Sequence, residues 1–284
     1  MNQNPKQNII IDSSYLCYRA AFTMGDLSHE DKGTGVIFGF LSQIHQLAKK
    51  FDYPNFIFAW DSRKSFRRDL YHDYKKKNKE MTPEMIELME VAKPQFQEIR
   101  INVLPILGFK NTFIQVGIEA DDIIAMILEG DVTKEFTTIS SDNDLYQLLG
   151  HRFQMYDPKK KEFYSAKDFI NEYGINPDEW AKVKSIAGCD TDNVKGILNV
   201  GVKTAIKYVK GELKGSKVKL IQESSDIIHM CSTLVSLPHP RTLPVHLTKD
   251  EFSFANFETM CLNYGFRSFL KKGVYEEWKE ILNC

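Results

Sequence analysis

The hydrophobic positions fall into short unbroken runs, separated by longer stretches with helical spacing. Strands that alternate with helices are typical of an α/β protein with a mostly parallel central sheet flanked by helices. Three apolar, β-branched or aromatic runs predict buried strands over Asn8–Ile11, Phe56–Trp60 and Phe136–Ile139. Apolar residues at helical spacing predict helices over Val36–Phe51, Thr82–Val103 and Ile118–Leu128.

The pattern changes near residue 178. Beyond this point helical stretches are separated by Gly and Lys, and no further strong strand run occurs. We therefore predict two domains, an α/β core over residues 1–178 and a helical lobe over residues 179–284.

An aspartate follows each of the three predicted strands: Asp12, Asp61 and Asp142, the last with Asp144 close behind. Ligands bind at the carboxyl ends of parallel strands, so these acids are candidates for one site. A single Asp after a strand is usually a turn residue or a helix cap. Three such positions together make that alternative weaker.

A further acidic group opens the helix predicted from residue 118. Glu119 and Asp122 are spaced to share one helix face, and Asp121 lies beside them. Acids also favour a first helical turn for its dipole alone, which is the structural alternative. Two carboxylates at ~4 Å would repel by on the order of 4 kcal/mol, so converging acids must be protonated or balanced by cations.

Cations are the interpretation that we prefer. Oxygen ligands without His or Cys select hard ions such as Mg²⁺ or Mn²⁺. The acids exceed the one or two carboxylates that a single Mg²⁺ usually takes, which indicates two ions ~3.5–4 Å apart and metal-activated water acting on a phosphodiester.

Positive charge is concentrated in two segments, although the formal net charge is only −1. Residues 62–79 hold eight Lys or Arg against two Asp, and residues 194–219 hold seven Lys against one Glu. In the first segment the cations alternate with Phe66, Tyr71 and Tyr74, so phosphates can be neutralised while bases stack. The alternative is an ordinary solvated helix face.

The second basic segment contains Gly196–Ala205, in which small residues precede a predicted helix. Such a turn lets backbone N–H groups approach a phosphate, and it resembles a helix-hairpin-helix turn. Gly-rich turns between helices are common, so this pattern alone is only moderately specific.

Taken in order, the motifs resemble the bacterial and bacteriophage 5′-to-3′ exonuclease and flap endonuclease family, which includes the N-terminal domain of many DNA polymerases I. The match spans roughly residues 8–270, through IIIDSSYLCYRA, AWDSRKSFRRDLYHDYK, GIEADDIIA, SSDNDLYQLL, GCDTDNVKGILNVGVKTA and, weakly, YGFRSFL. The resemblance implies a PIN-like nuclease core with a basic helical arch at about 62–105. It also implies a helix-three-turn-helix DNA-binding element in the C-terminal lobe.

The same resemblance assigns roles to individual residues. It implies a first metal site from Asp12, Asp61, Glu119, Asp121 and Asp122, and a second from Asp142, Asp144 and Asp192. It implies catalytic contacts from Arg67, Tyr74 and Lys75, where a cation supports the scissile phosphate and an aromatic ring stacks a base. It implies DNA contacts from Arg63, Lys64, Arg68, Lys76, Lys77, Gly196, Asn199, Gly201, Lys203, Thr204 and Lys207.

Two positions depart from the family pattern. Cys189 stands where the bacterial motif Gly-Asp-x-Ser-Asp-Asn has a metal-ligating Asp, and the neighbouring Asp190 is the candidate replacement. Asn78 stands where a basic residue often follows the Tyr-Lys pair. The family pattern also implies two Mg²⁺ or Mn²⁺ ions, with K⁺ at the helix-three-turn-helix.

The implied activity is a free-standing 5′ nuclease that removes RNA primers or 5′ flaps at nicks during DNA replication, with replication proteins as partners. Five scattered cysteines without a CxxC pair, no signal sequence and no long apolar run favour a cytoplasmic protein of a bacterial or phage-infected cell, and we expect a monomer. Two rivals remain: a metal-dependent phosphatase or phosphotransferase, which explains the acids only, and a non-catalytic structure-specific DNA-binding protein.

Overall fold

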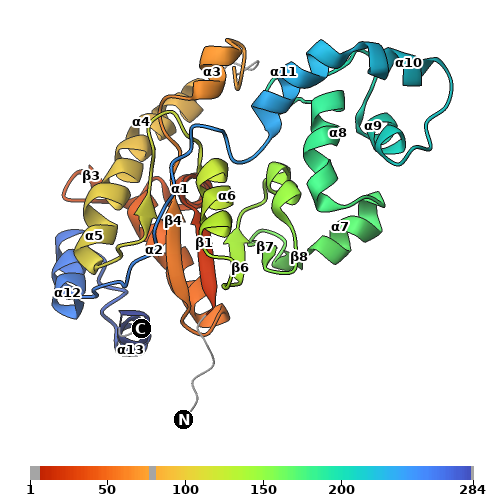
Figure 1. Cartoon of the computed structure of the whole chain (residues 1–284). Helices are drawn as coiled ribbons and strands as arrows, with labels where there is room; N and C mark the ends of the chain where they lie inside the picture. Colours follow the sequence, from red (N-terminus) through yellow and green to blue (C-terminus); the bar gives the residue numbers. More distant parts are fainter. Residues whose placement is uncertain (1–6, 77–80, 283–284) are drawn as a thin grey trace. The chain divides into compact units, whose positions relative to one another are not determined.

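The structure, a computed structural model, describes residues 7–76 and 81–282 (Figure 1). The chain divides into two compact units. Unit 1 comprises Met1–Trp60, Glu80–Phe113 and His246–Cys284, and unit 2 comprises Asp61–Lys79 and Ile114–Val245. The predicted domain boundary at residue 178 lies inside unit 2, and that functional division stays a prediction.

Unit 1 contains three parallel strands in the order β5-β4-β1 and a layer of helices. Its elements are β1 (Asn8–Asp12), α1 (Ser13–Met24), β2 (Ser28–His29), β3 (Lys32–Gly33), α2 (Gly35–Lys50), β4 (Asn55–Ala59), α4 (Pro83–Glu98), the π-helical turn η1 (Ile99–Val103), α5 (Leu104–Leu107), β5 (Thr112–Phe113), α12 (Phe254–Asn263) and α13 (Lys272–Leu282).

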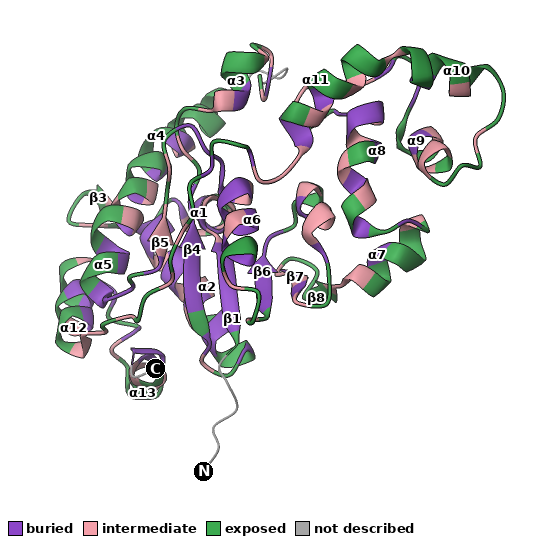
Figure 2. Ribbon diagram, in the orientation of Figure 1, coloured by how far each residue is buried: buried purple, intermediate pink, exposed green. Residues whose placement is uncertain are grey.

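The core of unit 1 forms around β1 and β4. Ile9, Ile10 and Ile11 are fully buried, because parallel strands covered by helices have no solvent face. Phe58 of β4 lies with its ring centroid 6.1 Å from that of Phe40 on α2, and α2 also packs against α1. Figure 2 shows this burial as purple along most of the two strands. The carboxyl end of β1 is therefore firmly held.

Unit 2 contains β6 and β7, which pair in parallel, and β8, which pairs antiparallel with β7. Its elements are α3 (Phe66–Leu70), α6 (Ala120–Gly130), β6 (Phe136–Ile139), η2 (Asn143–Leu148), β7 (Phe153–Asp157), β8 (Glu162–Tyr164), α7 (Ala166–Tyr173), η3 (Pro177–Glu179), α8 (Trp180–Ala187), β9 (Gly188–Cys189), β10 (Val194–Lys195), α9 (Val202–Val209), α10 (Ser216–Glu223) and α11 (Ser225–Val235).

The α/β class and the mostly parallel pairing are confirmed. Each predicted strand and helix is found within a few residues, except that the helix predicted to Val103 leaves α geometry after Glu98 and continues as η1. The region after residue 178 is helical apart from the two-residue strands β9 and β10. Across residues 7–76 and 81–282 no helix has the length and apolar character needed to span a membrane.

Candidate functional site

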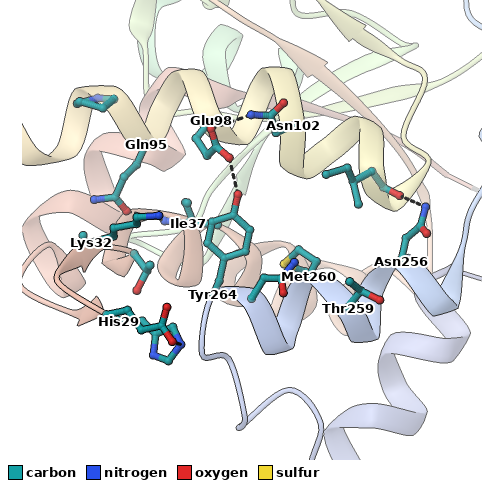
Figure 3. A pocket seen from close by; sticks show the side chains of 16 residues that line it. His29, Lys32, Ile37, Gln95, Glu98, Asn102, Asn256, Thr259, Met260 and Tyr264 are labelled. Carbon is teal, nitrogen blue, oxygen red and sulfur yellow. Dashed lines mark hydrogen bonds and ion pairs between the residues drawn. The ribbon is translucent and has the colours of Figure 1, made fainter.

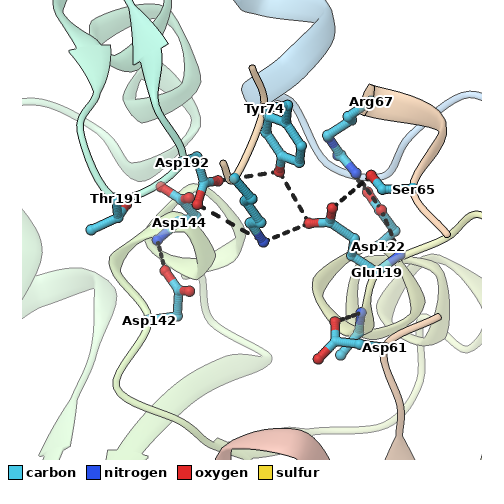
Figure 4. A network of polar contacts seen from close by, with 12 residues as sticks. Asp61, Ser65, Arg67, Tyr74, Glu119, Asp122, Asp142, Asp144, Thr191 and Asp192 are labelled. Atoms are coloured by element: carbon cyan, nitrogen blue, oxygen red, sulfur yellow. Dashed lines mark hydrogen bonds and ion pairs between the residues drawn. The ribbon is translucent and has the colours of Figure 1, made fainter. Parts of the chain in front are cut away.

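The acids predicted as metal ligands are divided between the units. Asp12 belongs to unit 1, where it ends β1 and caps α1 by accepting from the Tyr15 backbone N at 3.0 Å. The others belong to unit 2 and are Asp61, Glu119, Asp121, Asp122, Asp142, Asp144, Asp190 and Asp192. Figure 4 shows the polar network that several of them form.

Four of these acids surround the start of α6. Glu119 is the N-cap and forms a capping box with Asp122, while Asp61 accepts from the Ala120 backbone N at 2.9 Å. Asp121 lies in the first helical turn and is half-buried. Side-chain capping therefore occurs at this helix start, and it also fixes the carboxylates where α6 begins.

Asp122 forms a fully buried ion pair with Arg67. The guanidinium donates from Nη1 to Oδ2 at 2.6 Å and from Nη2 to Oδ1 at 2.7 Å. Oδ1 also accepts from the His239 backbone N at 2.7 Å, and Oδ2 from that of Glu119 at 3.3 Å. Every carboxylate oxygen of Asp122 therefore has two N–H partners.

Arg67 is only 2% exposed, and two of its other N–H groups donate to the carbonyl oxygens of Leu234 and Ser236. Burial opposes the charge, but Asp122 outweighs burial and holds the pKa of Arg67 above its ordinary value. In this arrangement Arg67 positions Asp122. The predicted contact of Arg67 with a phosphate and the predicted metal ligation by Asp122 stay predictions.

Lys75 lies between carboxylates of two different segments. Its Nζ is 2.7 Å from Glu119 Oε2 and 3.9 Å from Asp192 Oδ1. Its backbone has a left-handed φ of 51° and donates to the Asp192 carbonyl at 2.7 Å. A bulky residue in this conformation is strained, and such strain is concentrated at functional sites.

Tyr74 is buried beside Lys75. Its hydroxyl lies 3.0 Å from Glu119 Oε2 and 3.2 Å from Asp192 Oδ2, so it can donate to either. Its ring packs in a hydrophobic cluster with Cys189, Cys231, Val194, Leu234 and Val235. At 2% exposure this ring is enclosed by protein, so the predicted stacking on a base stays a prediction.

The two carboxylates beside Lys75 differ in their pKa. Burial alone would raise the pKa of Glu119, but the charges of Lys75 and Arg67 outweigh burial and lower it. Burial raises the pKa of Asp192 to about 6; Lys75 opposes this rise, and the charges of Asp144 and Glu119 add to it. Asp192 therefore titrates close to neutral pH, where a cation and a proton compete for it.

A second polar group joins β9 to η2. Within the described residues, one set of three side chains brings its ligand atoms within 4.8 Å of one another, and it consists of Asp144, Cys189 and Asp192. Lys184, in the last turn of α8, places Nζ 2.6 Å from Asp144 Oδ1 and 3.4 Å from Cys189 Sγ. Asp190 is exposed and outside this set.

Asp142 lies beside this group without joining it. It caps η2 by accepting from the Asp144 backbone N at 2.8 Å, and it is exposed. Its carboxylate is therefore positioned at the carboxyl side of β6, as predicted. The ligand roles of Asp142 and Asp190 stay predictions.

The predicted basic arch is described only in part. Arg63, Lys64, Arg68 and Lys76 are exposed, whereas Lys77 lies outside the described residues. Arg68 donates to the Tyr74 carbonyl at 3.2 Å and so braces the turn that carries Tyr74 and Lys75.

The predicted duplex-binding turn connects β10 to α9. Asn199, Gly201, Lys203 and Lys207 are exposed, while Thr204 and Gly196 are half-buried. Asn199 has a left-handed φ of 61°, and its carbonyl accepts from Lys217 Nζ at 3.0 Å.

Gly196 has a packing role. A Cβ there would lie 2.3 Å from the Gly188 backbone N, and one at Gly188, whose φ is +82°, would lie 2.4 Å from the Gly196 backbone N. These two backbones can approach so closely only because both residues lack a side chain.

Three participants were not predicted as site residues. Ser65 donates to Glu119 Oε1 at 2.9 Å, Lys184 pairs with Asp144, and His239 uses its backbone N–H on Asp122. Lys184 could have been found from its place one turn before the Gly-Cys-Asp motif. His239 could not have been found in the sequence, because its contact is made by a backbone N–H, which does not depend on the residue type.

A cavity of about 670 Å³ lies in unit 1, among η1, α12 and the β2–β3 hairpin (Figure 3). Glu98 accepts there from the Tyr264 hydroxyl and from Asn102 Nδ2. None of the predicted site residues lines this cavity.

The fold and the carboxylate network define an α/β protein with an acidic site braced by lysines. Residues 7–174 match the family described as "5'-3' exonuclease, N-terminal resolvase-like domain". The chain belongs to this 5′-3′ exonuclease family, whose members are hydrolases acting on ester bonds, and the predicted family is confirmed.

Similar proteins support this assignment. The chain is 32% identical to the 5′-3′ exonuclease of Aquifex aeolicus over 207 residues, which cover 71% of this chain and 68% of that protein. It is 26% identical to DNA polymerase I of Bacillus caldotenax over 94% of its own length, but it spans only 32% of that polymerase.

A solved structure shares the fold. The bacteriophage T5 flap endonuclease, in a pseudo-enzyme-product complex with DNA and metal ions, superposes with a TM-score of 0.67 at 21% identity, over 98% of each chain. At this identity the likeness concerns the fold alone.

Proposed function

We propose that this chain is a structure-specific 5′ nuclease. It hydrolyses phosphodiester bonds at 5′ flaps, nicks and RNA primers on duplex DNA, and it depends on divalent cations. The observation that carries the proposal is the placement of Lys75 between Glu119 and Asp192, because a half-buried cation beside acidic ligands suits a reaction at a phosphate.

The residues fit a divalent cation by the chemistry of their donors. Carboxylate oxygens from Asp142, Asp144, Asp192 and Glu119 are the ligands that Mg²⁺ and Mn²⁺ prefer, and no histidine is among them. Lys75 and Lys184, which pair with Glu119 and Asp144, support a site that stabilises positive charge. Asp61, Asp121 and Asp122 are the further unit 2 members of the proposed two-cation set, and the family resemblance adds Asp12 and Asp190 as candidate ligands. When bound, the cations supply an activated water and polarise the phosphate.

The surrounding side chains have distinct tasks. Arg67 fixes the orientation of Asp122, and Tyr74 holds Glu119 and Asp192 near each other. Lys75 is 36% exposed at its side chain, so it can exchange a carboxylate for a phosphate oxygen when substrate arrives. Its charge then stabilises the transition state more than the bound substrate.

Duplex binding is assigned to the segment from α8 to α9. We infer a helix-three-turn-helix there, with the exposed Asn199, Gly201, Lys203 and Lys207 facing the phosphate backbone and K⁺ as a bound monovalent ion. Lysines and backbone N–H groups position a duplex without reading base edges.

The test uses end-labelled flapped, nicked and RNA-primed duplexes with Mg²⁺, with and without EDTA. We expect cleavage near the 5′ end that EDTA abolishes. Lys75→Ala should lower kcat more than it weakens binding, whereas Lys76→Ala, at an exposed neighbour with a predicted DNA contact, should weaken binding and leave kcat nearly unchanged. Cleavage in EDTA, or hydrolysis of a small phosphate ester but not of DNA, would overturn the proposal.

A further inference from the structure

The β9–β10 hairpin directs a sulfur into the acidic group. Cys189 pairs with Val194 across the hairpin, and the Asp192 backbone N donates to the Cys189 carbonyl at 3.2 Å. Cys189 is only 4% exposed, so the hairpin holds the thiol inside the protein.

The sulfur is surrounded by polar groups as well as by the hydrophobic cluster. Cys189 Sγ lies 3.9 Å from Asp144 Oδ2 and 2.9 Å from Thr191 Oγ1. A cysteine with a packing role alone needs no polar neighbours. Cys189 instead contacts a carboxylate, a hydroxyl and the Lys184 ammonium. Cys231, in the same cluster, donates a hydrogen bond to the Lys195 carbonyl at 3.4 Å.

The donor set is therefore mixed. Asp144 and Asp192 contribute hard oxygens, and Cys189 contributes a soft sulfur within the same 4.8 Å limit. Soft thiolate ligands favour Zn²⁺ and its heavier analogue Cd²⁺, whereas Mg²⁺ takes oxygen ligands. Lys184 shows that this position already accommodates a cation against both the oxygen and the sulfur.

We propose that Asp144, Cys189 and Asp192 form a binding site for a thiophilic divalent cation, with Cys189 as a direct ligand. The proposal rests on the proposed function in that it concerns the same cation-binding acids. When the ion binds, the thiol proton leaves to solvent and the Lys184 ammonium is displaced from Asp144. The site is then selective for Zn²⁺ or Cd²⁺ over Mg²⁺.

The test is a Cd²⁺ titration of the intact, phosphine-reduced protein, followed by the ultraviolet charge-transfer band of a cadmium–thiolate bond. All samples carry Cys284→Ser, because Cys284 lies outside the described residues. We expect a saturable band that excess Mg²⁺ does not remove and that EDTA abolishes. Cys189→Ser and Cys189→Asp should remove the band and weaken Cd²⁺ binding by more than the roughly 10- to 100-fold typical of losing an outer-shell partner.

Cys231→Ser is the matched control, since it removes a buried thiol of the same cluster and should leave the band intact. Absence of the band, or its persistence in Cys189→Ser, overturns the inference. Cleavage of a flapped duplex with Mg²⁺ is measured on the same samples. Cleavage without the band overturns only the thiolate site, and the band without cleavage overturns only the nuclease proposal.

Discussion

Asp192 belongs to both polar groups of unit 2, the one around Lys75 and the one around Cys189. It lies near Tyr74 and Lys75 on one side, and it shares the candidate cation group with Asp144 and Cys189 on the other. Its pKa of about 6 follows from burial and from the neighbouring acids. Protonation and cation binding are therefore alternatives at this carboxylate.

We expect a pH dependence with opposite signs for stability and cation binding. The folded-state pKa of Asp192 lies above that of an exposed aspartate. Raising the pH through about 6 therefore lowers the stability of the metal-free protein. The same change increases Mn²⁺ affinity, because the ligand loses its proton. Mn²⁺ titrations and urea unfolding between about pH 5 and pH 8 check both signs. Asp192→Asn should flatten both profiles, and unchanged profiles in this variant would refute the assignment.

The Arg67–Asp122 pair predicts a large decrease in stability on substitution. Arg67→Ala leaves Asp122 charged in a fully buried position, and breaking a buried pair in this way typically costs ~3–5 kcal/mol. Arg67→Lys should recover only part of this stability, because lysine cannot make the bidentate contact. Urea unfolding is the measurement, with Arg68→Ala as the exposed control at about 1 kcal/mol or less. Equal stabilities of the two alanine variants would show that the pair does not hold the fold.

At the scale of elements, short connections position the chemistry. The turn before α6, the hairpin β9–β10 and the 3-10 helix η2 each contribute one or two carboxylates to unit 2. These connections are too short to show a hydrophobic period. Their charged residues were the feature of the sequence that predicted a site there.

Helix α9 predicts a sequence-independent salt effect. Replacing the exposed Lys203 and Lys207 by Ala should flatten the slope of log affinity against log salt by about 0.9 for each phosphate that the protein no longer neutralises. The change should be alike for two unrelated duplexes of the same shape. Binding across a salt series is the measurement, and Lys159→Ala with Lys160→Ala, on the β7–β8 turn, is the matched control. An unchanged slope, or a weakening confined to one duplex, would remove α9 from the binding surface.

For the whole molecule, the sequence was sufficient for the main strands and helices and for the family. The runs at Asn8–Ile11 and Phe136–Ile139 are strongly apolar, so burial dictates their structure. Helix α1 and strands β7 and β8 were not predicted, because their polar residues interrupt any clear period. Tertiary packing determines such segments more than local preference does.

The site was predicted in its acids but not in its pairings. Arg67 belongs to a run of cations that usually indicates an exposed face, yet it is buried, because Asp122 and two carbonyl groups compensate its charge. Pairings of this kind join residues more than 50 positions apart and depend on the finished fold. Sequence patterns therefore show which groups are available and leave their partners open.

The close approach of Gly188 and Gly196 has a consequence for how this protein can change over generations. Any side chain at either position would collide with backbone atoms, so mutation cannot easily move the hairpin relative to the end of α8. The residue at 189, by contrast, can be exchanged one side chain at a time on an unmoving backbone. At the proposed thiolate site, metal preference is thus a trait that a single codon can alter, while the framework that presents residue 189 is inherited unchanged.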